Sequence, residues 1–207
     1  VKNGGISMVT ISLCMIVRNE EKNLAKCLDS LKDLFEEIVI IDTGSTDKTK
    51  QIAFQYTNQI YDFEWAEDFS LARNFAFSKC SMDYIYTADA DELLDSTNHL
   101  KFLQLKEVLL PEIEIVQMKY IENNLQSVLN CVSEYRPKLF KRQRNFIWID
   151  PIHETIRLDP VVFDSDIEIC HQPDRLHASR DFSTFEKAYA RDGLLSKNLY
   201  TMYAKEL

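Results

Sequence analysis

The chain has very little glycine, and this absence limits how it can bind a phosphate group. Only four of its 207 residues are glycines, and it contains neither a Gly-x-Gly-x-x-Gly run nor a Gly-x-x-x-x-Gly-Lys-Ser/Thr run. Such loops bind phosphates through closely approached backbone N–H groups. A phosphate ligand of this chain must therefore be bound by a metal ion and by side chains.

A basic excess, a long apolar segment and closely paired cysteines are also missing. The formal net charge is −9, so we expect no nucleic-acid partner. Every apolar run is far shorter than the roughly 18 residues that cross a bilayer, and we expect no membrane span. The five cysteines are odd in number, widely spaced and without a Cys-x-x-Cys pair. A reducing, cytoplasmic location fits this pattern better than a disulfide framework.

The length suits one domain with a small appendage. Residues 1–7 lack the apolar core of a signal peptide and are interpreted as leader or tag residues before Met8. We expect the domain to occupy residues 8–180 and a helical extension to occupy residues 181–207. No glycine or proline lies near Leu207 to end that helix, so we expect the native chain to continue.

The first ninety residues alternate between apolar strands and amphipathic helices. Asn19 is interpreted as the N-cap of the first helix, on which Leu24, Cys27, Leu28 and Leu31 have helical spacing. Alternation with short connections is typical of a mainly parallel α/β sheet. Ligands bind such sheets beyond the carboxyl ends of the strands. The predicted strands are 9–17, 38–41, 58–61 and 84–88, and a further helix is predicted over 69–78.

The second half of the chain has a different pattern of predicted secondary structure. Several strand-like segments follow one another without intervening helices, which predicts a smaller antiparallel extension of the sheet. A helical pattern returns over 183–199. The predicted strands are 113–120, 128–140, 146–149 and 167–170.

Two carboxylates follow the strand 84–88. Asp89 and Asp91 are two residues apart, and in an extended segment such residues point the same way. The pair can then converge on one hard divalent cation, which can bind a diphosphate and neutralise a phosphate leaving group. An Asp-x-Asp run alone is common in surface loops, so its neighbours along the sequence decide its meaning.

Two more clusters accompany the aspartate pair. Asp42 ends a strand and begins the turn Asp42–Asp47, in which Ser45–Asp47 are interpreted as the cap of the next helix and Asp42 itself as facing the ligand edge. A carboxylate there can accept a hydrogen bond from a base N–H or a ribose hydroxyl. Arg73 can bind a phosphate or an aspartate in a bidentate way, or form a surface salt bridge with Asp68 or Glu67.

A further cluster along the chain is Ile152-His153-Glu154. An adjacent His and Glu can supply a metal ligand and a general base, although a structural role for His153 is the more common explanation. Arg157 stands where a zinc-binding His-Glu-x-x-His run needs its second histidine. Among the other histidines, His171 is the best placed for the edge of a site, and no role is assigned to it.

Taken together and in this order, the clusters resemble family 2 glycosyltransferases with the GT-A fold. The similarity is greatest to a small bacterial branch whose members often carry helical repeats after the catalytic domain. It covers most of residues 9–157 through the segments Ile11–Glu20, Asp42–Thr49, Asp68–Asn74, Asp89–Glu92, Pro137–Phe140 and Ile152–Glu154.

The resemblance implies a nucleotide-binding half at about 8–95 and an acceptor half at about 96–180. It implies an inverting transfer of one sugar from a nucleotide-diphosphate sugar, usually a UDP-sugar, to a saccharide, lipid-linked saccharide or protein acceptor. Mn²⁺ or Mg²⁺ is the implied cofactor. Independently of the resemblance, the apolar face expected on the final helix could pack on a missing C-terminal region or on a second subunit of a homodimer. The implied donor-binding residues are Ile16, Arg18, Asn19, Asp42, Arg73, Asp89 and Ala90; the metal ligands are Asp89, Asp91 and His153; the general base is Glu154 or Asp150.

Two departures from the family pattern refine this expectation. The Gln-x-x-Arg-Trp motif and membrane helices of polymer-elongating branches are absent, which favours transfer of a single sugar. Asp150-Pro151 stands where relatives often have a glycine, which adds a second candidate base. The alternatives are a catalytically silent module that binds a nucleotide sugar or a protein partner, and a nucleotidyltransferase, whose glycine-rich basic loop is missing.

Overall fold

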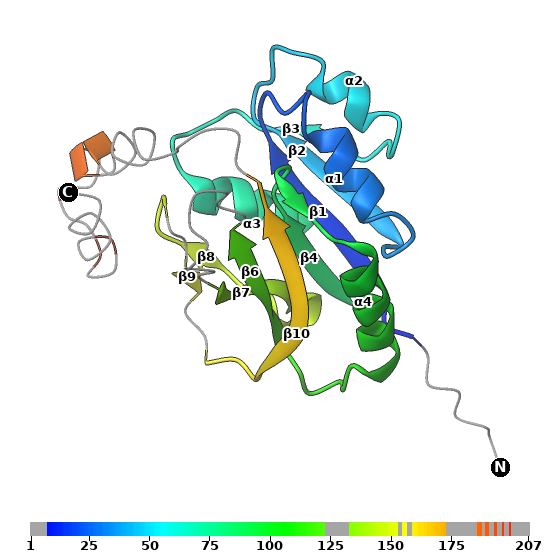
Figure 1. The fold of residues 1–207 in the computed structure, drawn as a ribbon. Helices are drawn as coiled ribbons and strands as arrows, with labels where there is room; N and C mark the ends of the chain where they lie inside the picture. Colours follow the sequence, from blue (N-terminus) through cyan, green and yellow to red (C-terminus); the bar gives the residue numbers. More distant parts are fainter. Residues whose placement is uncertain are drawn as a thin grey trace.

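The computed structural model describes residues 8–122, 133–152, 155–156 and 159–172, together with scattered positions between 186 and 199. Within these residues a curled sheet carries helices on both faces (Figure 1). The strands are β1 (Ile11–Val17), β2 (Glu37–Asp42), β3 (Ile60–Asp62), β4 (Tyr84–Ala88), β5 (Glu92–Leu93), β6 (Ile115–Glu122), β7 (Ser133–Lys141), β8 (Trp148–Ile149), β9 (Thr155–Ile156) and β10 (Val162–His171). The helices are α1 (Leu24–Ser30), α2 (Thr49–Ala53), α3 (Phe69–Lys79), α4 (Ser96–Val108) and the 3₁₀ turn η1 (Arg142–Arg144).

The main sheet has the order β3-β2-β1-β4-β7-β6-β10-β5, and β8 and β9 form a separate antiparallel pair. Strands β3, β2, β1 and β4 are mutually parallel. Every residue of β1 except Ile16 is buried, as expected for a parallel strand covered on both faces. The predicted parallel half is therefore confirmed, and its strand 84–88 has the bounds of β4.

The second half of the sheet is only partly antiparallel. Strand β7 pairs antiparallel with β4 and with β6, whereas β10 runs parallel to β6. The smaller antiparallel extension that the sequence predicted is present in the pairs of β7 with β4 and β6, of β10 with β5 and of β8 with β9. The parallel pair of β6 with β10 is the exception, because a long connection, which contains β7 and the β8–β9 pair, returns the chain to the starting end of β6. Of the predicted helix over 183–199, only scattered positions belong to the described residues.

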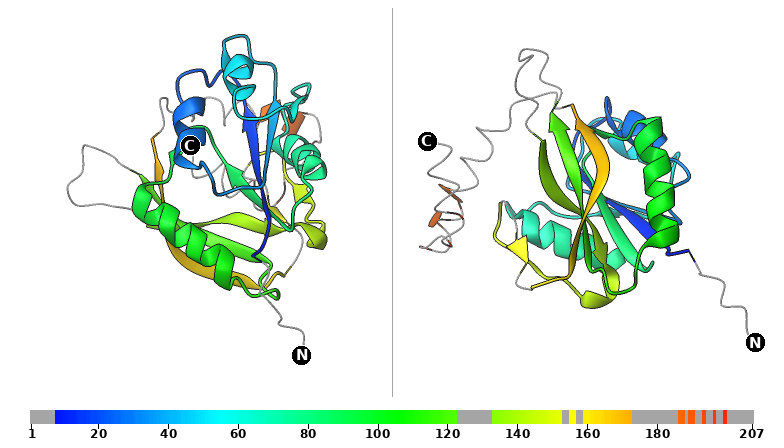
Figure 2. Two further views of the ribbon diagram at one scale, coloured as in Figure 1. Left: turned by 90° about the vertical axis from the view of Figure 1, so that its right-hand side faces the viewer. Right: turned by 60° about the horizontal axis from the view of Figure 1, so that its bottom comes forward.

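Helices cover both faces of the sheet, as Figure 2 shows from two further directions. Helices α1 and α4 pack on one face, where Leu24, Leu28 and Phe102 belong to the main core. Helix α3 packs on the other face through Ala76, beside Cys14 and Ile85. Asp68 caps α3 by accepting hydrogen bonds from the N–H groups of Ser70 and Leu71. No helix in the described part of the chain is long and apolar enough to cross a membrane.

An aromatic cluster joins α4 to the centre of the sheet. The Phe102 ring meets Tyr86 edge-on with centroids 5.3 Å apart, and it meets Phe35 at 5.5 Å. Phe35 and Tyr86 stack at 5.2 Å. Phe102 and Tyr86 are both almost fully buried. Such a cluster fixes α4 and the strand β4 in one rigid unit.

Replacing Phe102 by alanine is expected to lower the free energy of unfolding by about 3–5 kcal/mol, because it leaves a cavity between α4 and β4. Urea unfolding followed by circular dichroism measures this change. The matched substitution Leu100→Ala removes an exposed side chain of the same helix and should change stability by less than about 0.5 kcal/mol. Equal losses for the two variants would contradict this account of the core.

Candidate functional site

The loops that follow β1 and β2 are held together by reciprocal hydrogen bonds. The N–H of Asn19 donates to Ser45 Oγ at 3.0 Å, and Asn19 Oδ1 accepts from the N–H of Thr46 at 2.8 Å. Asn19 has a positive φ of 57° and does not cap α1, whose N-cap is Asn23. The prediction that Asn19 is a helix cap was therefore wrong: its side chain joins two strand ends instead.

Asp42 organises the turn after β2. Its side chain is buried, and its Oδ1 accepts hydrogen bonds from the N–H groups of Gly44 at 3.0 Å and Ser45 at 2.9 Å. The turn requires Gly44, whose φ is +97°. Ser45 is not a cap of α2; Asp47 accepts from the N–H of Thr49 at the first residue of that helix.

The second carboxylate oxygen of Asp42 has no hydrogen-bond partner. Oδ2 is buried and accepts no bond from the residues that the structure describes. A buried acceptor without a donor costs about 1–3 kcal/mol, and a bound ligand that supplies an N–H or O–H removes this cost. Asp42 is therefore the residue of this loop best suited to accept a hydrogen bond from a ligand.

The segment after β4 is a turn and not an extended run. The N–H of Glu92 donates to the backbone oxygen of Asp89 at 3.1 Å. The side chains of Asp89 and Asp91 therefore cannot be assumed to point the same way, as they would in an extended segment. Asp89 is exposed, whereas the methyl group of Ala90 is buried in the main core. A ligand can therefore contact Ala90 only through its backbone.

Asp91 meets a histidine from the far end of the sequence. His171 Nε2 lies 3.2 Å from Asp91 Oδ2, with side chains that are 15% and 16% exposed. His171 ends β10, and the next residue, Gln172, donates its N–H to the backbone oxygen of Asp91 at 2.9 Å. The His171 ring also packs on Tyr120 with centroids 4.8 Å apart. The sequence alone could not pair these residues, because the pairing of β10 in the sheet decides where the histidine lies.

The Asp91–His171 contact fits a divalent cation. Two ligand atoms each about 2.1 Å from Mg²⁺ and at right angles to each other are about 3 Å apart, close to the observed separation. Carboxylate oxygen and imidazole nitrogen are ordinary ligands of Mn²⁺. In the described residues no group of three or more His, Cys, Asp or Glu side chains surrounds a potential metal position. His153 and Glu154 lie outside the described residues.

A buried ion pair lies directly behind this turn. Lys138 Nζ, from β7, lies 2.7 Å from both carboxylate oxygens of Glu92. Burial raises the pKa of Glu92 above its ordinary value, and the adjacent Lys138 ammonium opposes that rise. Sequence analysis assigned no role to either residue, since a buried lysine is visible only in the folded chain.

Arg73 and Asp150 lie around the short β8–β9 pair. The Arg73 guanidinium stacks over the Trp148 ring at 4.8 Å, and Asn74 holds the backbone of Trp148 through two hydrogen bonds. Asp150 has a positive φ of 74°, a conformation that glycine adopts more readily than other residues. Its Oδ2 accepts from Thr155 Oγ1 at 3.4 Å.

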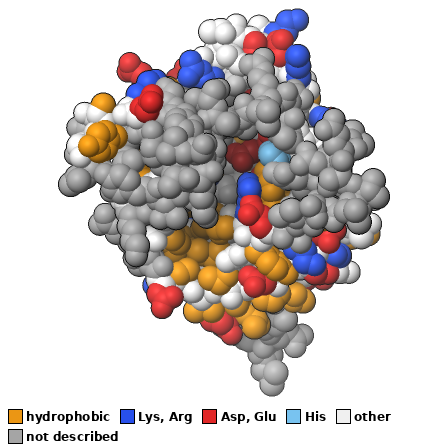
Figure 3. Space-filling model, turned by 60° about the vertical axis from the view of Figure 1, so that its left-hand side comes forward, with side chains coloured by type: hydrophobic (Ala, Val, Ile, Leu, Met, Phe, Trp, Pro, Cys, Tyr) orange, Lys and Arg blue, Asp and Glu red, His pale blue; other side chains and the backbone are white. Residues whose placement is uncertain are grey.

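One face of the molecule has a hollow in its surface (Figure 3). Figure 3 shows acidic, histidine and basic side chains gathered in its centre, with apolar side chains below them. Arg18 is exposed next to the Asn19 loop, and Ile16, the second-to-last residue of strand β1, is partly buried. The structure thus brings the ends of β1, β2 and β4 to one edge, as the sequence predicted.

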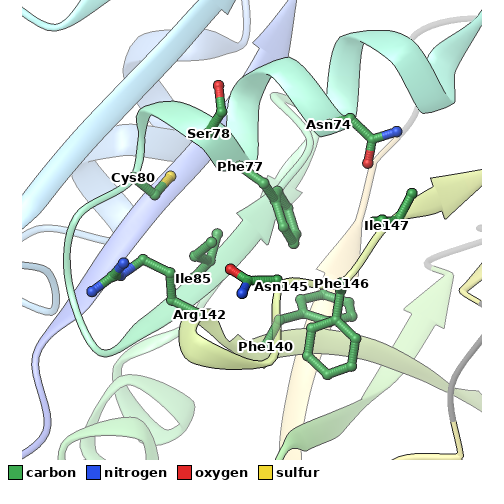
Figure 4. Close-up of a pocket in the computed structure, with 10 residues that line it drawn as sticks. All are labelled: Asn74, Phe77, Ser78, Cys80, Ile85, Phe140, Arg142, Asn145, Phe146 and Ile147. Atoms are coloured by element: carbon green, nitrogen blue, oxygen red, sulfur yellow. The ribbon is translucent and has the colours of Figure 1, made fainter.

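A separate pocket of about 520 Å³ opens elsewhere, between α3 and η1 (Figure 4). Phe77, Phe140 and Phe146 contribute its apolar wall, and Ser78, Arg142 and Asn145 contribute polar atoms. It reaches Ile85, near the start of β4, and thus lies toward the opposite end of that strand from Asp89. The pocket is distinct from the strand-end site.

Comparison with known proteins identifies the family. The profile of glycosyl transferase family 2 matches residues 12–156, well over half of the chain. The chain belongs to glycosyl transferase family 2. The matched range contains all the strand-end loops of the site except the end of β10, and it therefore includes Asp42, Asp89 and Asp91.

Several relatives share long segments with this member of the family. A TPR repeat-containing protein of Synechococcus elongatus is 46% identical over 90 residues, which are 44% of this chain and 22% of the relative. The SPbeta prophage-derived glycosyltransferase SunS of Bacillus subtilis is 39% identical over 117 residues, 55% of this chain and 28% of the relative. An uncharacterized glycosyltransferase of Rickettsia felis is 24% identical and covers 94% of this chain and 66% of the relative. The chain thus spans less than a third of the length of the first two relatives.

Solved structures share the fold. Glucosyl-3-phosphoglycerate synthase from Mycobacterium tuberculosis, in complex with Mn²⁺, UDP and glucosyl-3-phosphoglycerate, has a TM-score of 0.64 and 16% identity, covering 91% of this chain and 82% of that protein. The same enzyme with Mg²⁺ and UDP has a TM-score of 0.61. The chain therefore has the GT-A fold that the sequence predicted.

Replacing Gly44 by alanine should destabilise the Asp42 turn. No atom lies within 4 Å of a Cβ added there, so the cost comes from the positive φ and is expected to be about 1–2 kcal/mol. Chemical denaturation measures the loss. Lys48→Ala, at an exposed position with φ −82° in the same loop, should stay within about 0.5 kcal/mol of the parent chain. An unchanged stability of Gly44→Ala would show that this turn is not strained.

Proposed function

We propose that this chain is the catalytic domain of an inverting, metal-dependent glycosyltransferase that moves one sugar from a UDP-sugar to a hydroxyl acceptor. The contact between Asp91 and His171, at the same sheet edge as Asp42, is the observation that carries the proposal. Family membership and the metal- and UDP-bound neighbours of the same fold support it. Among the described residues, Cys14, Cys27 and Cys80 are buried free thiols, which supports a cytoplasmic location.

The base-binding end of the proposed donor site is the Asp42 loop. Uracil presents an N–H that can donate to the unpartnered Oδ2, while Oδ1 continues to hold the turn. Ile16 and Arg18 lie at the adjacent end of β1, and the Asn19 loop borders the same edge. A base that reaches Oδ2 must displace the atoms that now cover it. Burial of the resulting hydrogen bond would make base recognition specific.

The diphosphate end is the turn after β4. Asp91 and His171 would hold Mn²⁺ or Mg²⁺, with Asp89 exposed beside them and His153 as a further candidate ligand. The metal, when bound, supplies positive charge to the departing diphosphate. Arg73 stacks against Trp148. Its guanidinium is proposed to supply a second positive charge to the departing diphosphate, from the side of β8.

Transfer then needs only one displacement. The acceptor oxygen forms a bond to the anomeric carbon as the bond from that carbon to the diphosphate oxygen breaks, and the configuration inverts. The acceptor proton passes to a general base, for which Asp150 and Glu154 are the candidates. Asp150 directly follows β8, the strand whose Trp148 ring stacks with Arg73.

Metal-dependent nucleotide binding tests the proposal. UDP with Mn²⁺ at about 100 times its dissociation constant should stabilise the chain by about 2.7 kcal/mol, observed as a higher unfolding midpoint. Asp91→Ala and His171→Gln should each fold and lose the metal-dependent part of this shift, because each removes one proposed ligand. Hydrolysis of UDP-sugars with and without Mn²⁺ provides the activity readout.

Asp159→Ala is the matched control, since Asp159 is exposed and precedes the opposite end of β10. A shift with Mn²⁺ and UDP that survives Asp91→Ala would remove Asp91 from the site. No shift with any nucleoside diphosphate would favour the silent module, and formation of a nucleotidyl product from a nucleoside triphosphate would favour the nucleotidyltransferase.

Asp42→Asn should weaken UDP binding about 10- to 100-fold. The Asn oxygen must remain with the N–H groups of Gly44 and Ser45, so its NH₂ replaces Oδ2 and a donor faces the uracil N–H. Isothermal titration calorimetry measures the affinity. Asp33→Asn, the same change at an exposed position before the opposite end of β2, should leave it unchanged. Full UDP affinity in Asp42→Asn would exclude Asp42 from base recognition.

A further inference from the structure

The Lys138–Glu92 pair is buried where a charge is costly. The two side chains are 6% and 3% exposed, and removing a carboxylate and an ammonium from water costs several kcal/mol for each ion. Apolar side chains of similar volume often stabilise a protein as well as such a pair does. The pair therefore needs an explanation other than overall stability, and its position supplies one.

Glu92 holds both ends of the turn that carries Asp91. Its Oε2 accepts a hydrogen bond from the N–H of Asp89 at 3.2 Å, and its own N–H donates to the Asp89 oxygen at 3.1 Å. Lys138 in turn fixes the Glu92 carboxylate from β7, the strand paired with β4. The ammonium thus connects the rigid sheet to the turn through one carboxylate.

The pair also sets the charge of the site. Asp89, Asp91 and Glu92 place three carboxylates within four residues. Lys138 compensates the buried one, so that the turn and this lysine together carry two negative charges and not three. Two is the number that a divalent cation neutralises. The buried position of Glu92 leaves Asp89 and Asp91 as the carboxylates that a ligand can reach.

We propose that Lys138 and Glu92 are positioning residues that fix the Asp89–Asp91 turn for metal and diphosphate binding. This inference rests on the proposed function. Neither residue touches the donor in this scheme, and both act through the backbone of Asp89. Residues that orient metal ligands in this indirect way typically contribute about 10- to 100-fold in metal affinity or activity.

A second buried lysine provides a matched comparison. Lys106 is 3% exposed and pairs with Glu36 at 2.8 Å, while also donating to the backbone oxygen of Leu34. Glu36 Oε2 accepts from the N–H of Ile11, at the start of β1. This ion pair therefore lies at the opposite end of the parallel strands from the turn, and losing it should affect stability without affecting the site.

The decisive variant is the neutral double substitution Glu92→Gln with Lys138→Met. It avoids the uncompensated buried charge that either single change leaves, and the introduced glutamine retains an oxygen for the N–H of Asp89. We expect an unfolding midpoint near that of the parent chain, an Mn²⁺ dissociation constant raised at least about tenfold, and a kcat lowered by a similar factor. Affinity for uridine in the absence of metal should not change, because Asp42 lies outside the turn.

Mn²⁺ binding is followed by electron paramagnetic resonance of the free ion, with and without UDP, and the double variant is compared with Lys106→Met. Unchanged Mn²⁺ affinity and kcat in the double variant, in a parent chain that binds Mn²⁺, overturn the positioning role and leave the proposed function intact. A parent chain that binds no Mn²⁺ under either condition overturns both. Weakened Mn²⁺ binding in Lys106→Met would show that removing any buried, ion-paired lysine has this effect, which also overturns the inference.

Discussion

The parallel pairing of β1 with both β2 and β4 is the constraint on which the rest of the structure depends. In this register Val17 lies beside Asp42 and Met15 lies beside Ala88, so three chain segments leave the sheet at one edge. The strand is almost entirely buried between α1 and α4 on one face and α3 on the other. Its backbone bonds therefore form away from water, and the positions of the loops follow from a rigid core.

Side-chain hydrogen bonds, together with the positive φ of Gly44, shape the loops at that edge. Asn19 donates a hydrogen bond to Ser45 and accepts one from Thr46 across two strand ends, and Asp42 holds its own turn through one oxygen. Buried carboxylates are costly unless each oxygen has a donor. The turn uses one Asp42 oxygen, and among the described residues no donor reaches the other, so a donor from a ligand can bind there while the turn keeps its own bonds.

Prediction from the sequence worked where the pattern is local. The apolar, β-branched run of β1 and the run Tyr84–Ala88 identify strands because both faces of a parallel strand are covered. Prediction failed where a local pattern has two outcomes. Asn19 is as suitable for a positive φ and a cross-loop bond as for a helix cap, and only the neighbouring loop decides between them. The direction of β10 is likewise set by the path of a long connection and not by its own residues.

The sequence by itself determined the strands of the parallel half, the family and the placement of Asp42, Asp89 and Asp91 at strand ends, since each depends on residues close together in the chain. It did not predict helix α4. The tertiary structure alone decided which distant side chains join them. His171 reaches Asp91 because β10 pairs with β5, and Lys138 reaches Glu92 because β7 pairs with β4. Strand pairing brings residues together across long separations in sequence, and no local pattern encodes which strands pair.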